Sequence, residues 1–364
     1  MKRFLKKVQL FVALCLFLPC LAGCAEKQTE PFKRVDTAMG TIVSQTIYVT
    51  KQGREAWSLQ EETKGREENA DAIMNLISDL EEDMLSWRLS TSEIYQANLR
   101  AVGGEESQEG SPVSHTLCDI ISTCLSVSEA SDGAFDIALG QVTRLWNIDE
   151  WSKKEDTGYQ LPDKKELEEA LLKSGSRFVS LQGETLYLSE QVQLDLGAVG
   201  KGIALQVILD YLQEQKNQNM LEGAIISVGG SVLTFGEKPD GSSFRVGIVN
   251  PMDTSKNLGY LSLTGQWCVS TSGDYERFVE VDGVRYHHII DPSTGYPADS
   301  DVRSVTILTK DGLLSDALST ACFVLGVEEG SRLAEDFGAE ALFVDEDGQI
   351  HMTEGMERYF HLWE

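Results

Sequence analysis

Basic residues are scarce in this sequence of 364 residues. It holds 31 Lys and Arg against 58 Asp and Glu, which gives a formal net charge of -27. Duplex nucleic acid is held by many Lys and Arg contacts to its phosphates, so this balance excludes such a partner. A phosphate-bearing ligand would need a local cation, most simply a metal ion. The hydrophobic share of 41% excludes a disordered chain and is enough for one large or two modest domains.

A hydrophobic run long enough for a spanning helix, which needs roughly 20 residues, is also missing. Residues 1–23 instead hold four basic residues and no acidic one, with an apolar run at 8–18. This is the layout of a secretory signal. Leu21-Ala22-Gly23-Cys24 matches the bacterial lipobox pattern. We therefore expect a lipoprotein signal peptide at 1–23 and a lipid-modified Cys24 that anchors the protein to the cell membrane on its extracytoplasmic side. The alternative is an ordinary signal peptide with an incidental cysteine.

Metal-binding cysteine motifs are absent. The cysteines that remain after the signal peptide and the modified residue are Cys118, Cys124, Cys268 and Cys322. Their spacing fits neither CxxC nor a zinc site. They lie in apolar stretches, so buried free thiols are favoured, although an exported location permits a disulfide.

The order of the expected elements indicates an α+β fold. Residues 24–36 are polar and predict a tether, and residues 37–49 alternate as a first strand. Residues 50–70 predict a solvated insertion, and helices are expected at 70–85, 117–127, 199–215, 313–325 and 329–337. Strands are expected at 178–181, 185–188, 224–228, 244–249, 302–308, 341–344 and 349–352. Hairpins with intervening helices favour mixed or antiparallel sheets over the regular alternation of a doubly wound fold.

A carboxylate and a hydroxyl share one face of the helix expected at 313–325. Asp316 and Thr320 are four residues apart, which places them one helical turn from each other. Hard cations prefer oxygen pairs of this kind. On its own, such a pair near a helix start is usually a capping or surface arrangement.

A glycine-rich segment precedes the helix expected at 199–215. It reads Asp195-Leu196-Gly197-Ala198-Val199-Gly200-Lys201-Gly202. Its glycines allow close backbone approach, the helix start attracts phosphate, and Lys201 adds a cation. Both the P-loop pattern and GxGxxG are missing, so the segment alone does not identify a nucleotide site.

Two further motifs hold polar and aromatic side chains. Residues 271–277 read Thr-Ser-Gly-Asp-Tyr-Glu-Arg, and His287-His288 precede Ile289-Ile290-Asp291-Pro292. Histidine is suited to general-base work near neutral pH, although a pair on a strand can also be a simple polar contact. Residues 132–136 read Asp-Gly-Ala-Phe-Asp, where the aromatic ring could stack on a flat ligand or belong to the core.

Taken together, these motifs and Met39-Gly40-Thr41 have the order and spacing of the ApbE family. From about residue 34 to 350 the chain resembles an ApbE-type FAD:protein FMN transferase. The resemblance implies a single domain at 37–364 with ApbE-type, T-fold-like architecture. It also implies Mg²⁺-dependent transfer of the FMN moiety of FAD to a threonine hydroxyl of a target protein, with release of AMP.

The resemblance assigns roles residue by residue. The Mg²⁺ ligands would be the Asp316 carboxylate, the Thr320 hydroxyl and the Ala198 carbonyl. Flavin and nucleotide contacts would come from Met39, Trp87, Ala134, Phe135, Asp136, Asp195, Lys201 and Ile290. His288 is the candidate base for the threonine proton, and Asp274 is the candidate orienting or alternative base. Two departures from the family pattern, Gly200 in place of alanine and Gln141 in place of proline, affect local backbone geometry and remove no ligand.

The partner implied is a protein with a Ser/Asp-Gly-Ala/Ser-Thr motif, such as a subunit of a membrane redox complex. Asp132-Gly133-Ala134 ends in Phe135, so the chain is not its own substrate. Two alternatives stay open: an FAD pyrophosphatase that yields FMN and AMP, and a non-catalytic flavin-binding lipoprotein. The identity of the target and the oligomeric state are not encoded in any motif.

Overall fold

The computed structural model describes residues 30–54, 72–102, 109–154, 158–189 and 191–363. The predicted signal peptide, Cys24 and most of the predicted insertion at 50–70 lie outside these residues. Within them, no helix combines the length and the apolar character that crossing a membrane requires.

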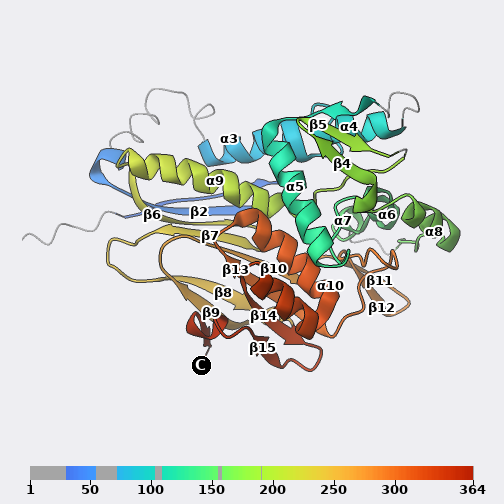
Figure 1. The fold of residues 1–364 in the computed structure, drawn as a ribbon. Coiled ribbons are helices and arrows are strands. Elements are labelled where there is room, and N and C mark those ends of the chain that lie inside the picture. The colour runs from blue at the N-terminus through green and yellow to red at the C-terminus, as the bar shows by residue number, and fades with distance from the viewer. Residues whose placement is uncertain (1–29, 55–71, 103–108, 155–157, 190, 364) are drawn as a thin grey trace, which may run out of the picture.

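An eight-stranded sheet forms the centre of the fold (Figure 1). Its strands, in spatial order, are β1 (Phe32–Ala38), β2 (Thr41–Val49), β6 (Leu221–Val228), β7 (Ser231–Gly236), β10 (Trp267–Gly273), β13 (Val302–Thr309), β14 (Glu340–Asp345) and β15 (Ile350–Met352). Every neighbouring pair is antiparallel. The α+β prediction is therefore confirmed.

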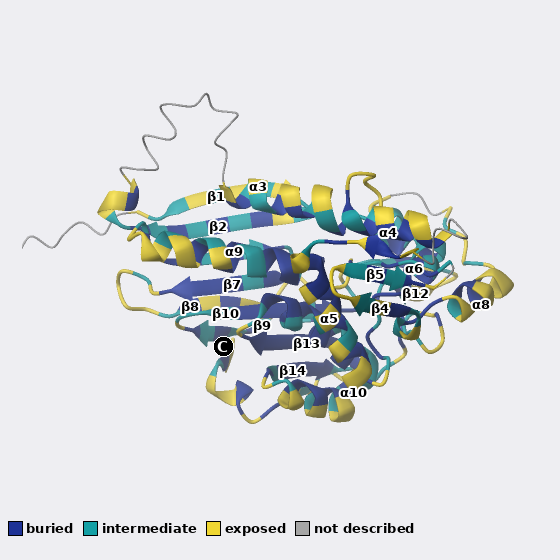
Figure 2. Cartoon of the chain, turned by 45° about the horizontal axis from the view of Figure 1, so that its top comes forward, coloured by how far each residue is buried: buried dark blue, intermediate teal, exposed yellow. Residues whose placement is uncertain are grey.

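The sheet is covered on both faces, because successive side chains of a strand point in opposite directions. Cys268 and Ile307 pack on the side of the two long helices, α9 (Gly200–Asn217) and α10 (Gly312–Asp336). Val269 and Leu308 pack on the other side, against a three-stranded sheet. That sheet consists of β16 (Phe360–Leu362), β9 (Asn257–Leu263) and β8 (Phe244–Val249). Figure 2 shows the buried central strands between these layers.

The remaining elements gather at one end of the central layers, on the right of Figure 1. The helices there are α4 (Glu93–Val102), α5 (His115–Ala130), α6 (Gly140–Trp146), α7 (Ile148–Trp151) and α8 (Lys164–Leu172). The strands are β3 (Ser111–Pro112), β4 (Val179–Gln182), β5 (Thr185–Leu188), β11 (Phe278–Val281) and β12 (Val284–His287). Nearer the sheet, α3 (Ala72–Asp79) runs into a π-helical segment (Leu80–Leu85) and contacts α9. Two 3₁₀ turns, Ser176–Phe178 and Met356–Arg358, complete the described elements.

Most expected elements are present, and the differences have local causes. Helix α5 covers the helix expected at 117–127, and Ser114 caps it, with its hydroxyl accepting from the Leu117 amide at 3.2 Å. The helices expected at 313–325 and 329–337 are the two parts of α10, which is interrupted at Gly326, where φ is 79° and ψ is -173°. Helix α4 was not predicted, because its buried face holds one large apolar residue, Ile94, beside Ala97, Asn98 and Ala101.

The predicted tether and first strand need correction. The sequence predicts a tether to residue 36 and one strand at 37–49, whereas the structure shows a hairpin of β1 and β2. Met39 and Gly40 form its turn with φ of 49° and 67°, as two-residue hairpin turns of the primed type require. Three of the seven residues of β1 are charged, and its aliphatic residue Val35 is exposed, so its sequence looks like that of a solvated linker. The folded domain therefore begins by Phe32.

Candidate active site

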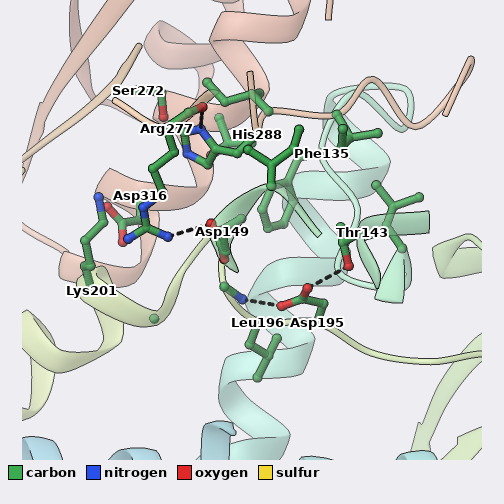
Figure 3. Close-up of a pocket in the computed structure, with 18 of the residues that line it drawn as sticks. Phe135, Thr143, Asp149, Asp195, Leu196, Lys201, Ser272, Arg277, His288 and Asp316 are labelled. Carbon is green, nitrogen blue, oxygen red and sulfur yellow. Dashed lines mark hydrogen bonds and ion pairs between the residues drawn. The ribbon is translucent and has the colours of Figure 1, made fainter. Parts of the chain in front are cut away.

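A cavity of ≈ 260 Å³ lies where the β1–β2 turn, the starts of α9 and α10, and the elements gathered at one end of the central layers meet (Figure 3). This is close to the lower end of the roughly 300–1,000 Å³ of small-molecule sites. Twelve of the residues predicted from the sequence line it: Met39, Trp87, Ala134, Phe135, Asp136, Asp195, Ala198, Lys201, His288, Ile290, Asp316 and Thr320. The motifs that are scattered over the chain thus converge on one pocket.

Asp316 is the most deeply buried carboxylate that lines the pocket. It lies in the second turn of α10 and is 2% exposed. Its Oδ2 accepts from the Gly202 amide at 2.6 Å, and its Oδ1 accepts from the Ser231 hydroxyl at 2.8 Å. The contact is possible because α9 and α10 approach closely: a Cβ at Gly202 would lie 2.2 Å from the Gly312 carbonyl oxygen. Both carboxylate oxygens keep lone pairs for a further ligand.

The oxygens around Asp316 fit a hard cation with few protein ligands. Thr320 follows one turn later on α10, and its hydroxyl makes no hydrogen bond to any part of the chain that the structure describes. Ala198 lies exposed in the turn before α9 and lines the same cavity. Within the described ranges, no three His, Cys, Asp or Glu side chains form a metal cluster. The donor set therefore suits Mg²⁺, which keeps several waters and binds substrate phosphates, better than a metal that needs an all-protein cage.

The segment before α9 is fixed by Asp195. This carboxylate accepts from the Thr143 hydroxyl at 2.7 Å and from the Gly197 amide at 2.9 Å. The resulting turn leads into α9 at Gly200, with Lys201 in the first helical turn. A helix start and a lysine ammonium both attract anions, so this wall of the pocket is suited to phosphate.

His288 is held by one main-chain oxygen. Its amide and its Nδ1 lie 3.1 Å and 3.2 Å from the Arg277 carbonyl oxygen. Because a carbonyl only accepts, Nδ1 must carry a proton, and Nε2 is left with a lone pair. Burial lowers the pKa of His288 to about 4, and the cations Arg277 and Lys201 act in the same direction, whereas Asp149 opposes them. The imidazole is therefore neutral at pH 7 and can accept a proton.

Asp274 does not belong to the pocket. It is absent from the cavity lining, and its carboxylate accepts from Arg303 Nη1 at 2.5 Å, with Arg285 Nη1 at 4.0 Å from its other oxygen. The prediction that Asp274 orients His288 or replaces it as base is corrected by this placement. Sequence proximity suggested the role, but the side chain points toward the arginines of neighbouring strands.

The residues predicted to contact the flavin or the nucleotide differ in how accessible their side chains are to a ligand. Trp87 is half-buried, with the guanidinium carbons of Arg88 and Arg144 at 4.0 Å and 4.4 Å from its ring centroid. Phe135 is 1% exposed, so little of it can meet a ligand. The Asp136 carboxylate accepts from the amides of Ala138 and Ser176 at 2.7 Å and 2.6 Å. Asp136 thus shapes the wall of the pocket through the backbone.

Sequence reasoning missed several residues of the lining. Asp149 forms an ion pair with Arg277, and Thr143 supports Asp195. Ser272 lies in a strand motif that the sequence did single out, and its hydroxyl is 2.8 Å from that of Ser319. Asp149 lies in a helix of four residues, and nothing in its sequence neighbourhood indicates the pocket.

Comparisons with known proteins identify the family of the chain. The ApbE family profile matches residues 39–343. An "FAD:protein FMN transferase" of Treponema pallidum is 31% identical over 95% of this chain and 93% of its own length. One from Klebsiella pneumoniae is 33% identical over 75% and 81%. The flavin transferase ApbE of Vibrio cholerae superposes with a TM-score of 0.75 at 26% identity, covering 91% of this chain and 99% of that one. The ApbE protein of Thermotoga maritima gives 0.74 at 30% identity, covering 91% and 99%. This chain belongs to the ApbE family.

Proposed function

We propose that the protein is an FAD:protein FMN transferase, which moves the FMN moiety of FAD to a threonine hydroxyl of a target protein and releases AMP. The observation that carries the proposal is the convergence of Asp316, Thr320, Lys201 and neutral His288 on one cavity. The relatives of known name support the same activity. Phosphoryl transfer asks for charge neutralisation and positioning more than for covalent work by the enzyme, and the pocket offers both.

The pocket residues would have two tasks, to neutralise the phosphate charge and to accept the threonine proton. Asp316, Thr320 and the Ala198 carbonyl would hold Mg²⁺, which supplies neutralisation of the diphosphate charge. Lys201 and the start of α9 bind the phosphate oxygens. The threonine oxygen bonds to the FMN phosphorus while the bond from that phosphorus to the AMP half breaks, and AMP leaves with the bridging oxygen. His288 Nε2 takes the threonine proton.

Incubation with FAD, Mg²⁺ and a target protein that bears the threonine motif tests this proposal. The expected result is a fluorescent target band after denaturing electrophoresis together with AMP release. Free FMN without a labelled band would identify a pyrophosphatase, and bound FAD without AMP release would identify a binding protein.

Asp316→Ala should abolish AMP release, because it removes the only carboxylate of the proposed Mg²⁺ ligands. Asp253→Ala is the matched control, since Asp253 lies in a loop, is not part of the cavity lining and pairs with Lys256 at 2.7 Å. Retention of AMP release by Asp316→Ala in a folded protein would exclude the proposed metal site.

The proposed location is the extracytoplasmic side of the cell membrane, with Cys24 modified by lipid and a membrane redox-complex subunit as target. Its support is the sequence Leu21-Ala22-Gly23-Cys24. Mass spectrometry of the N-terminal peptide checks it: a peptide that starts at Cys24 with added acyl mass is expected, and an unmodified Cys24 would contradict it.

A further inference from the structure

An ion pair joins two walls of the pocket next to His288. Asp149, in the short helix α7, accepts from Arg277 Nη1 at 2.8 Å (Figure 3). Arg277 lies in the segment that connects β10 to β11, which is separate from α7. Both residues line the cavity, with side-chain exposures of 41% and 34%. None of the chemistry described above uses this pair.

Arg277 connects the ion pair to His288 through its own backbone. Its side chain is bound by Asp149, and its carbonyl oxygen accepts from both the amide and Nδ1 of His288. Tethering the side chain limits movement of the residue, and a fixed carbonyl fixes the ring and its tautomer. The same three-residue chain therefore leaves Nε2 as the basic nitrogen.

We propose that Asp149 and Arg277 are a positioning pair for His288: the pair fixes the carbonyl that orients the ring, and its opposite charges balance each other at the imidazole. The part of His288 as proton acceptor rests on the proposed function. The orientation and charge balance do not, since they concern the free protein.

Four charged or titratable groups act on His288 in the structure. Asp149 favours its protonated form, and Arg277, Lys201 and His287 disfavour it, in addition to burial. Removing Asp149 leaves the arginine uncompensated, which must lower the pKa of His288 further. Removing the Arg277 charge leaves the aspartate uncompensated, which must raise this pKa. The pair thus predicts opposite effects from its two members.

NMR titration of His288 in the full chain without FAD or metal tests the pair directly. A midpoint near pH 4 means that about half of the imidazoles are protonated at that pH. A shift of about half a pH unit changes this fraction at pH 4 to roughly one quarter in Asp149→Asn and roughly three quarters in Arg277→Gln. The double variant should return to about one half, and Arg277→Lys should stay close to the unmutated protein.

Glu150→Gln is the matched control, because Glu150 is the next acid of α7 but pairs with Arg88 at 3.6 Å and is not among the groups that act on His288. Its titration should be unchanged. Shifts of the same sign in Asp149→Asn and Arg277→Gln, or no shift in either, would overturn the pair.

The pH profile of flavin transfer separates this inference from the proposed function. The acid limb of kcat/KM should move down in Asp149→Asn and up in Arg277→Gln, in step with the NMR midpoints. Opposite NMR shifts with an unmoved acid limb would uphold the pair and exclude His288 as the base.

Discussion

At the scale of single residues, the protonation state of His288 would set the pH range of the proposed reaction. Burial and two cations lower its pKa to about 4, so the imidazole is protonated, and unable to accept, only below that pH. We expect kcat/KM for flavin transfer to be flat from pH 5 to 8 and to fall about tenfold per unit below pH 4. A fall centred near 6.5, the value of an ordinary histidine, would contradict this environment.

Ser231 should raise the affinity of the proposed metal site although it is not itself a proposed ligand. Its hydroxyl is fully buried and donates to Asp316 Oδ1, and groups that orient a metal ligand typically contribute 10–100-fold in metal affinity. Ser231→Ala should therefore raise the Mg²⁺ concentration needed for half-maximal AMP release by about tenfold.

Ser270→Ala provides the comparison for this variant. Ser270 is equally buried, but its hydroxyl pairs with Ser315. An equal change in Mg²⁺ dependence in both variants would show that the effect is general loosening of the core.

The role of a residue could be predicted where all residues of a motif lie on one helix. Asp316 and Thr320 are one helical turn apart, so their spacing alone brings them together. The Asp149 carboxylate acts on His288 from 139 positions away along the chain (288 − 149), and only the fold brings them together. The role predicted for Asp274 is not supported for the converse reason: Asp274 is near His288 in the sequence, but its carboxylate faces Arg303.

At the scale of elements, the turn between β1 and β2 controls one wall of the pocket. Gly40 has φ of 67°, and Met39 beside it lines the cavity. A Cβ in this backbone region costs about 1–2 kcal/mol, and asparagine tolerates it best among residues with side chains. Gly40→Ala should lower the free energy of unfolding by about 1 kcal/mol and raise KM for FAD.

Gly40→Asn should stay close to the unmutated protein in the same denaturant titration and kinetic assay. Equal loss in both variants would mean that space at the turn, and not backbone conformation, is limiting.

The contact between α9 and α10 depends on two glycines. A Cβ at Gly202 would meet the Gly312 carbonyl oxygen at 2.2 Å, and one at Gly312 would meet the Gly202 carbonyl oxygen at 2.4 Å. Gly202→Ala must push the helices apart, which should cost about 3 kcal/mol of unfolding free energy and displace Asp316 from the Gly202 amide. Chemical denaturation measures the first effect, and Mg²⁺-dependent AMP release measures the second.

Gly158→Ala is the control for this contact, because a Cβ at Gly158 would have no neighbour within 4 Å. A stable, active Gly202→Ala protein would show that the helices can separate without loss of the site.

Elements were predictable where their hydrophobic pattern is strong. Strand β8 has the bounds expected from its sequence, and α9 and α10 follow their helical periodicity closely. Strand β1 was missed because Lys33, Arg34 and Asp36 give it the composition of a linker. Its place in the sheet comes from pairing with β2, which no local pattern of β1 encodes.

At the scale of the whole molecule, the core encloses all four described cysteines as free thiols. Burial raises the pKa of Cys124, Cys268 and Cys322 to about 12 and also raises that of Cys118. Because the thiolate is the reactive form, iodoacetamide at pH 8 should leave all four unlabelled in the native protein and label them on unfolding. Peptide mass spectrometry would detect this, and a disulfide between any two would contradict it.

The sequence predicted the individual strands and helices better than their arrangement in layers. Alternating strands and amphipathic helices indicate an α+β fold, but they do not say which strands are neighbours. The order β6-β7-β10-β13 skips over β8 and β9, which form a separate layer with β16. Val269 and Leu308 reveal that second layer through their burial, which is a property of the assembled protein.

The early start of β1 sets how far the catalytic domain can stand from its proposed membrane anchor. Cys24 and Phe32 are eight positions apart, so the fully extended chain between them spans at most about 28 Å. The same linker would span about 45 Å if the fold began at residue 37. Strand β1 then leads directly to the pocket turn at Met39. If Cys24 is lipid-modified, the linker keeps the start of β1 within about 28 Å of the membrane, so the distance of a threonine from the bilayer, as well as its sequence motif, would select the targets.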